Sequence, residues 1–122
     1  MATIKELKDE LDSVIGLINM AKKEIIALNV ELRLIEEINS VIRMLEDAKT
    51  ELTFLQNIAT ALERGTEELS PNALQNSKKA FEKHAMDAYA GLIKILDKAA
   101  VKENLKQAKN KLSKITYAEI AL

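Results

Sequence analysis

The chain of 122 residues contains no cysteine and no tryptophan, and it has only one proline, three glycines and four aromatic residues. The lack of cysteine excludes disulfides, thiolate metal sites and thiol catalysis. Turn-rich β folds depend on glycine and proline, so the scarcity of both favours a few long helices. The scarcity of aromatic side chains implies an aliphatic core and argues against single-stranded nucleic-acid binding, which uses stacking platforms.

What is present is a balanced composition, with 48% hydrophobic residues, 30% charged residues and a net charge of −1. This balance suits one packed domain over residues 1–122 and is too apolar for intrinsic disorder. No segment approaches the roughly 20 apolar residues that a membrane-spanning helix needs. Charged residues begin at Lys5, so we expect no signal peptide and a cytoplasmic location.

The first half of the chain shows two heptad seams that differ in phase. Thr3 and Glu6 form a capping box, which predicts a helix that begins at Ile4. The first seam consists of Ile4, Leu7, Leu11, Val14, Ile18, Ala21, Ile25, Leu28, Leu32 and Ile35. The second consists of Ile38, Val41, Leu45, Ala48, Leu52, Leu55, Ala59 and Leu62. Because the second seam arrives one residue early, we expect a turn at residues 36–40 and helices over about 4–36 and 40–64.

The second half has clearer boundary signals. Gly65 is predicted to end the second helix in a left-handed conformation, and Ser70 with Pro71 to start the third. The third and fourth seams are Leu74, Phe81, Ala85, Ala88, Leu92, Ile95 and Ala99, then Val101, Leu105, Ala108, Leu112 and Ile115. A second phase change predicts a turn at residues 99–102, and helices over about 71–99 and 102–120. Residues 117–122 either continue the last helix or fray.

These seams predict an all-α protein, and we favour an antiparallel four-helix bundle. The alternative is a long antiparallel helical hairpin or coiled coil that oligomerises, because neither inner turn contains glycine or proline. A second apolar row beside the first seam would suit a helix placed between two partners. The row consists of Leu17, Met20, Ala27, Val30 and Leu34.

No combination of residues indicates catalysis, a cofactor or a metal site. His84 is the only histidine, and with Asp87 it offers two ligands, fewer than a metal site needs. We interpret His84 as a residue at the edge of the seam. Gly16 and Gly91 fall inside predicted helices, where we expect close helix packing or local flexibility.

Charge is distributed unevenly along the chain. Residues 1–64 carry eight basic and 12 acidic residues, a net charge of −4, whereas residues 65–122 carry ten and seven, a net charge of +3. The candidate partner-binding residues are Lys94, Lys98, Lys102, Lys106 and Lys109. The first four recur every four residues and would line one face of a continuous helix. They are either a solvated face that complements the acidic half, a docking surface for an acidic protein, or a contact for anionic membrane or nucleic acid.

Together these patterns predict a non-enzymatic interaction module that acts through protein–protein binding or self-assembly, as a scaffold, adaptor, inhibitor or immunity-type protein. The alternative is a membrane-active or peripheral membrane protein that uses its amphipathic helices. Nucleic acid is the weaker partner class, because the basic residues of residues 65–122 are all lysine.

Overall fold

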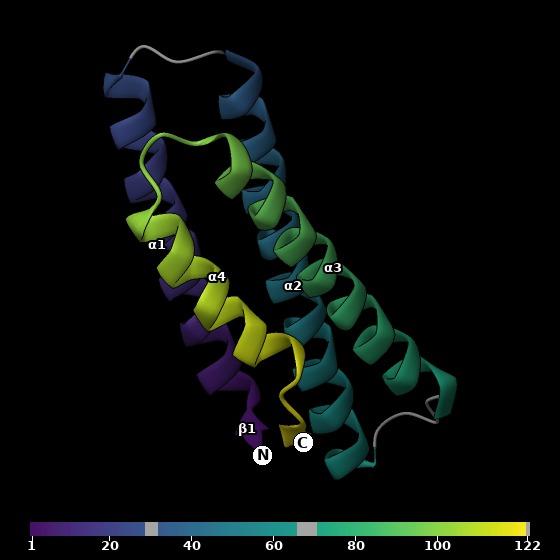
Figure 1. Cartoon of the computed structure of the whole chain (residues 1–122). Coiled ribbons are helices and arrows are strands. Elements are labelled where there is room, and N and C mark those ends of the chain that lie inside the picture. Colours follow the sequence, from purple (N-terminus) through teal and green to yellow (C-terminus); the bar gives the residue numbers. More distant parts are fainter. Residues whose placement is uncertain (29–31, 66–70, 122) are drawn as a thin grey trace.

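The structure is a computed structural model that describes residues 1–28, 32–65 and 71–121. Its described residues form four helices and two short strands. In chain order these are β1 (Ala2–Thr3), α1 (Ile4–Ala27), α2 (Leu32–Arg64), α3 (Pro71–Lys98), α4 (Glu103–Thr116) and β2 (Ile120–Ala121). Each helix packs against two others, in the cyclic order α1, α2, α3, α4 (Figure 1). The predicted antiparallel four-helix bundle is therefore confirmed, and the single long hairpin is wrong for this chain.

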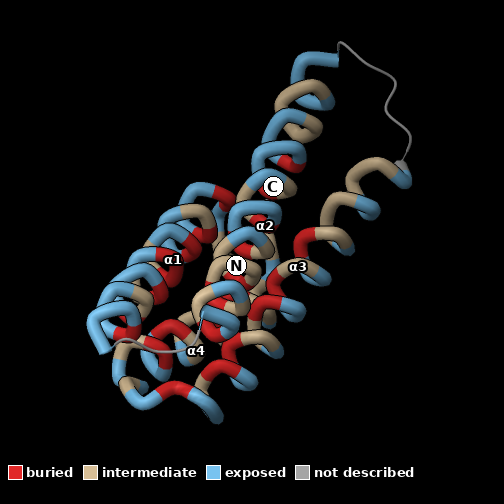
Figure 2. The backbone as a smooth tube through the Cα atoms, turned by 90° about the horizontal axis from the view of Figure 1, so that it is seen from above, coloured by how far each residue is buried: buried red, intermediate tan, exposed pale blue. Residues whose placement is uncertain are grey.

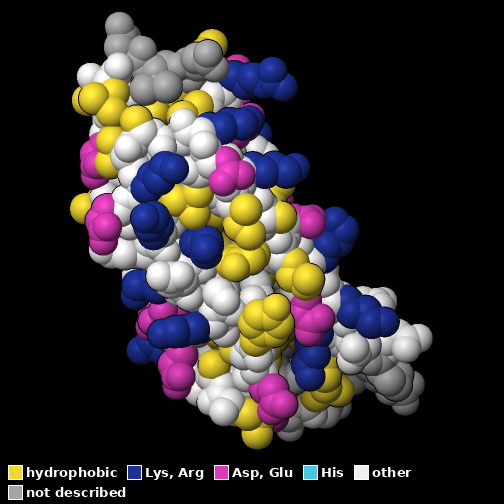
Figure 3. Space-filling view, in the orientation of Figure 1, with side chains coloured by type: hydrophobic (Ala, Val, Ile, Leu, Met, Phe, Trp, Pro, Cys, Tyr) yellow, Lys and Arg dark blue, Asp and Glu magenta, His cyan; other side chains and the backbone are white. Residues whose placement is uncertain are grey.

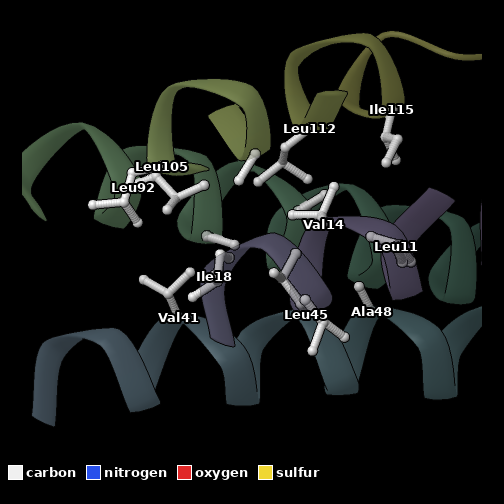
Figure 4. Close-up of a cluster of buried hydrophobic side chains, with 14 of the residues drawn as sticks. Leu11, Val14, Ile18, Val41, Leu45, Ala48, Leu92, Leu105, Leu112 and Ile115 are labelled. Atoms are coloured by element: carbon white, nitrogen blue, oxygen red, sulfur yellow. The ribbon is translucent and has the colours of Figure 1, made fainter. Parts of the chain in front are cut away.

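The core is built mainly from the predicted seams, brought together from all four helices (Figures 2 and 4), although Leu62 is exposed and Ala59, Leu74 and Val101 are only half-buried. Its largest fully buried side chains are Phe81, Leu11, Ile18, Ile25, Ile38, Leu45, Leu52, Leu55, Leu92, Ile95, Leu105 and Leu112. Among the described residues, no polar or charged residue is buried. The core therefore gains its stability from aliphatic burial, which contributes about 25 cal/mol for each Å² removed from water.

The first interhelical turn lies earlier in the chain than predicted. Helix α1 ends at Ala27 and α2 begins at Leu32, so residues 36–40 are helical and the turn expected there is wrong. Leu28 and Leu32 are 54% and 73% exposed, and the buried seam of α2 starts instead at Leu34. Leu28, Leu32 and Ile35 extend the heptad spacing in the sequence, although Leu28 and Leu32 lie outside the core.

The second apolar row does not make α1 a helix between two partners. Met20 and Ala27 are exposed, Leu17 is half-buried, and Leu34 belongs to the core as part of α2. Val30 lies outside the described residues. The row therefore does not form one shared surface.

The later boundaries agree with the sequence. Gly65 has φ of +63°, and its N–H donates to the Leu62 carbonyl at 3.2 Å, as expected of a helix-ending glycine. Pro71 is the first residue of α3, whereas its predicted cap, Ser70, lies outside the described residues. The turn at residues 99–102 is confirmed. The Thr3 cap is confirmed as well, because the Glu6 N–H donates to Thr3 Oγ1 at 3.1 Å.

The last residues do not extend α4 to residue 120 as predicted. Helix α4 ends at Thr116, and β2 pairs in parallel with β1, with Ala2 opposite Ile120 and Thr3 opposite Ala121. The Ala2 N–H donates to the Glu119 carbonyl at 2.9 Å, which fixes the two ends of the chain side by side (Figure 1). The half-buried Ala118 and Ile120 pack against the core, so leaving the helix buries apolar surface that a straight helix would expose.

The four described helices differ in length, and α4 is the shortest. Helix α2 has 33 residues and is about 50 Å long, whereas α4 has 14 residues and is about 21 Å long. Helix α3 therefore contacts α2 much more extensively than α4. On the side of α4, part of α3 is left without a covering helix.

Candidate functional site: an apolar row edged by lysines

The five candidate lysines do not lie on one helix face. Lys94 and Lys98 belong to α3, Lys102 is the N-cap residue of α4, and Lys106 and Lys109 lie on α4. Because the chain turns at residues 99–102, the helix is not continuous there and the lysines do not line one helix face. The structure divides the five between two different flanks of the bundle.

Lys94 and Lys98 lie on the flank of α3 that faces α2. Lys98 Nζ donates to both carboxylate oxygens of Glu37 on α2, at 3.0 and 3.3 Å. Lys94 lines a surface hollow of about 220 Å³ with Gly91 and residues of α2. Gly91 marks the closest approach of the two helices, since a Cβ there would lie 2.6 Å from Val41 Cγ2. This flank is committed to packing within the bundle.

The opposite flank of α3, beside α4, carries an apolar row of its own. It consists of Met86, Tyr89, Ile93 and Leu96, whose spacing of three, four and three residues places them on one face of the helix. Lys78 and Glu82 continue the same face toward the N-terminus of α3, and both border a hollow with residues 116–120. Met86 and Ile93 are 61% and 41% exposed, whereas Tyr89 and Leu96 are half-buried against the core.

Three lysines of α4 lie on the flank of that helix nearest this row. The flank toward α1 is identified by Asn104, which donates to Glu24 at 2.7 Å, and by Lys111, which lies 3.9 Å from Glu10. Lys102, Lys106 and Lys109 lie on the other flank, again at helical spacing. Because α4 packs between α1 and α3, this flank faces the side of α3.

We call the seven residues of these two rows the α3–α4 face: Met86, Tyr89, Ile93, Leu96, Lys102, Lys106 and Lys109. Figure 3 shows hydrophobic side chains running along the front of the molecule over α3 and α4, with lysine and arginine side chains beside them. Within residues 1–28, 32–65 and 71–121, Lys102, Lys106 and Lys109 form no salt bridge, and neither does Lys94. The lysines were predicted from the sequence, but the apolar row of α3 was not. The spacing of its four residues beside the core seam of α3 was the signal that could have identified it.

Several charges of the first half of the chain pair with one another or with the second half. Lys49 of α2 donates to Asp12 of α1, and this hydrogen bond raises the pKa of Lys49 above its ordinary value of 10.5. Partial burial lowers that pKa by a smaller amount, and the charges of Asp12 and Glu46 raise it further. The hollow around this pair, of about 420 Å³, mixes lysines with carboxylates and has no dominant charge.

His84 does not acquire the ligands of a metal site among the residues that the structure describes. The Asp87 carboxylate, which the sequence offers as its companion, accepts a hydrogen bond from Lys83 at 2.8 Å. No group of three or more potential ligands occurs in the described part of the chain. The half-buried position of His84 agrees with a residue at the edge of the core seam.

A second apolar surface lies at the end of the molecule where α1 meets α2. Ile26, Leu28 and Leu32 are all exposed there. These side chains sit beside the undescribed residues 29–31, so their surface is only partly defined by the structure. The α3–α4 face lies wholly within described residues and combines apolar and charged groups.

No protein-family model, curated protein or solved structure matches this chain. The helices of the described residues also include none with the length and apolar character needed to cross a lipid bilayer.

Proposed function

We propose that this protein is a non-enzymatic helical-bundle interaction module of the cytoplasm, which binds a partner protein through the α3–α4 face. A scaffold, an adaptor and an inhibitor or immunity-type protein all work in this way. The non-enzymatic assignment rests on a sequence with one histidine, no cysteine and no nucleophile beside a base. The observation that carries the proposal is the apolar row, with Met86 and Ile93 exposed, beside three lysines that form no salt bridge among the described residues.

The apolar part of the face supplies the driving force for binding. Met86 and Ile93 are long side chains at the surface, and burying such a side chain fully is worth about 1.5–3 kcal/mol. Tyr89 and Leu96 are held against the core, so they offer a rigid apolar floor beside the two exposed residues. Rigid anchors lose little conformational entropy when a partner covers them.

The lysines supply selectivity. Exposed charges contribute little affinity by themselves, but they speed the encounter with a partner of opposite charge and oppose one of like charge. Lys102, Lys106 and Lys109 lie on one side of the apolar row, so they favour one orientation of an acidic partner.

Affinity capture with matched variants tests this proposal. Immobilised protein would be incubated with extract of the source organism, and retained proteins quantified by mass spectrometry. We expect a partner that Met86→Gln/Ile93→Gln retains at least about tenfold less, as follows from losing central apolar anchors. The control variant Ile26→Gln/Leu32→Gln removes two exposed apolar residues elsewhere and should retain the partner. If both variants and the original protein retain the same proteins equally, the proposal is wrong.

Self-assembly is the other form of interaction that the apolar surfaces support. Light scattering after size-exclusion chromatography would show it as a mass above that of the 13.6 kDa chain. If the mass falls to the monomer in Met86→Gln/Ile93→Gln, the partner is a second copy bound at the same face. If it falls only in Ile26→Gln/Leu32→Gln, the end of α1 and α2 carries the association.

A further inference from the structure

We infer that the α3–α4 face binds an amphipathic helix with an acidic flank, supplied by another protein. This inference rests on the proposed function, because it names the chemistry of the partner at the same face. The juxtaposition that carries it is an apolar row on α3 beside a lysine row on α4.

The apolar row has the dimensions of a helix-binding surface. From Met86 to Leu96 the helix rises ten residues, which is about 15 Å or nearly three turns. A partner helix of similar length would present apolar residues at positions i, i+3 and i+7, the pattern by which helices dock on apolar surfaces. Because Met86 and Ile93 stay exposed beside α4, a docked helix would lie along the row and extend the bundle with packing of the same kind.

The lysine row specifies the charge of the partner. Lys102, Lys106 and Lys109 lie on α4 at spacings of four and three residues, so they edge only one side of the apolar row. They have no salt-bridge partner among the described residues, whereas Lys98 on the opposite flank of α3 pairs with Glu37. A docked helix would therefore place glutamate or aspartate on the side that meets α4.

The face suits a helix better than a lipid surface. Interfacial helices insert an apolar face by about 5–10 Å, which requires side chains that project from the surface. Tyr89 and Leu96 are packed on the core and cannot insert without leaving it. A partner helix brings its own projecting side chains, so it can fill the surface without unpacking the bundle.

A second copy of the chain does not supply a suitable helix. The most acidic of the described helices is α2, with six acidic and four basic residues, and its exposed large hydrophobic residues are Leu32, Phe54 and Leu62. Phe54 and Leu62 lie eight residues apart and Leu32 lies far from both, so they do not form a continuous exposed apolar row with an acidic flank. A different protein is the better fit.

A designed peptide tests the inference directly. The probe is a fluorescein-labelled helix of about 18 residues, since shorter helices are marginal in water. It carries leucine at i, i+3, i+7 and i+10, glutamate along one flank, and alanine and glutamine elsewhere. A matched peptide has lysine in place of every glutamate. Binding of each peptide to the full chain is measured by fluorescence anisotropy at about 50 mM and about 300 mM salt, because exposed charge pairs are screened.

Charge reversal on α4 provides the decisive comparison. We expect the intact protein to bind the glutamate peptide at least tenfold more tightly than the lysine peptide at low salt. Lys102→Glu/Lys106→Glu/Lys109→Glu should reverse that order. Lys102→Glu/Lys106→Glu repeats the test without the half-buried Lys109. The matched control Lys5→Glu/Lys23→Glu/Arg33→Glu reverses three exposed charges on α1 and α2 and should keep the original preference.

The following outcomes of these binding experiments would contradict the inference. Equal binding of the two peptides, or a reversal in the control as large as on α4, removes the role of the lysines. Lysine-dependent co-sedimentation with phosphatidylserine vesicles, without binding of the glutamate peptide, assigns the face to a membrane. If neither peptide binds but Met86→Gln/Ile93→Gln still loses a captured partner, the acidic helix is wrong and the proposed function stands. If that capture also fails, both are wrong.

Discussion

Helix α3 has two unlike flanks. The flank that faces α2 is packed against that helix, and we call it the closed flank. The flank beside α4 is exposed to solvent at Met86 and Ile93, and we call it the open flank. The first has Gly91 against Val41 and Lys98 paired with Glu37. The second leaves Met86 and Ile93 exposed and lies beside lysines that form no salt bridge within the described part of the chain. Both flanks belong to one helix, so the difference does not come from the local propensity of the chain. It arises because the two flanks lie on opposite sides of the core seam, and α3 packs much more extensively against α2 than against α4.

This contrast separates residues that stabilise the fold from residues that are free to bind. A side chain on the closed flank gains its energy within the bundle, and its removal leaves a cavity or an unpaired group. A side chain on the open flank gains that energy only when a partner covers it. Stability measurements on matched residues of the two kinds therefore test the division.

The largest expected effect separates two neighbouring residues of α3. Leu92 is fully buried and Ile93 is 41% exposed. Leu92→Ala should reduce the free energy of unfolding by about 2–5 kcal/mol, because it leaves a cavity among packed aliphatic side chains. Ile93→Ala should change it by less than about 1 kcal/mol, since Ile93 lies at the surface, 41% exposed, and its truncation leaves no enclosed cavity. Urea denaturation followed by circular dichroism measures both.

A loss of several kcal/mol in Ile93→Ala would contradict the open flank, because it would show that Ile93 is covered in solution. Combining Ile93→Ala with Met86→Ala extends the test to both exposed residues of the row. The double variant should remain within about 1–2 kcal/mol of the original protein, since the two sites make separate small contributions.

The next largest effect concerns the close approach of α2 and α3. Gly91→Ala should destabilise the protein by about 1–3 kcal/mol, as overpacking in tight contacts does. The new Cβ would lie 2.6 Å from Val41 Cγ2, and a β-branched side chain in a helix has almost no alternative rotamer. Gly16→Ala is the control, because a Cβ there meets nothing within 4 Å. It should stabilise the protein by about 0.5–1 kcal/mol through helix propensity.

Removing the obstructing methyl group checks the cause. In the Gly91→Ala background, Val41→Ala should cost less than it does alone, with a coupling energy of about 0.5–3 kcal/mol. Strictly additive changes in thermal denaturation would mean that Gly91 is needed for another reason.

Much of the fold could be predicted from the sequence, because heptad spacing identifies the side chains that face the core. The seams of Leu7 to Ile25 and of Ile38 to Leu55 are buried as expected. The first turn could not be placed, since Leu28, Leu32 and Ile35 continue the spacing without entering the core. Only the packing of the other helices decides where an apolar residue stops being covered. The pairing of β1 with β2 was missed for a similar reason: it depends on two chain ends meeting in space.

The candidate site was predictable only in part. Charge counting identified Lys102, Lys106 and Lys109, but it also grouped Lys94 and Lys98 with them on one face. The sequence could not show that Lys98 pairs with Glu37, because the two residues are 61 positions apart. Nor could it show that Met86 and Ile93 stay exposed, since their exposure depends on how closely α4 packs beside α3.

A smaller effect concerns the charge pair between α1 and α2. Lys49 on α2 and Asp12 on α1 are partly exposed, so their coupling should be at most about 1 kcal/mol. The raised pKa of Lys49 means that this stabilisation is present below the unfolded pKa and is lost as pH rises through the folded one. A double-mutant cycle with Lys49→Gln and Asp12→Asn should give a steady coupling at neutral pH that fades above about pH 10.5. A coupling that persists well above that pH would contradict the assignment.

The smallest expected effect is a difference in sign between lysines of the two flanks. Lys98→Gln removes the pair with Glu37 and should lower stability by up to about 1 kcal/mol. Lys106→Glu should instead raise stability by about 0.2–0.5 kcal/mol, because it replaces like charges at i and i+4, Lys102 and Lys106, by an opposite pair. The same substitution weakens binding of the glutamate peptide if the acidic-helix inference holds. A gain in stability together with a loss of binding would mean that Lys106 is unfavourable for the isolated bundle and is useful only in a complex. A loss of stability in Lys106→Glu would show that this lysine has a partner within the fold, and the division between the two flanks of α3 would not extend to α4.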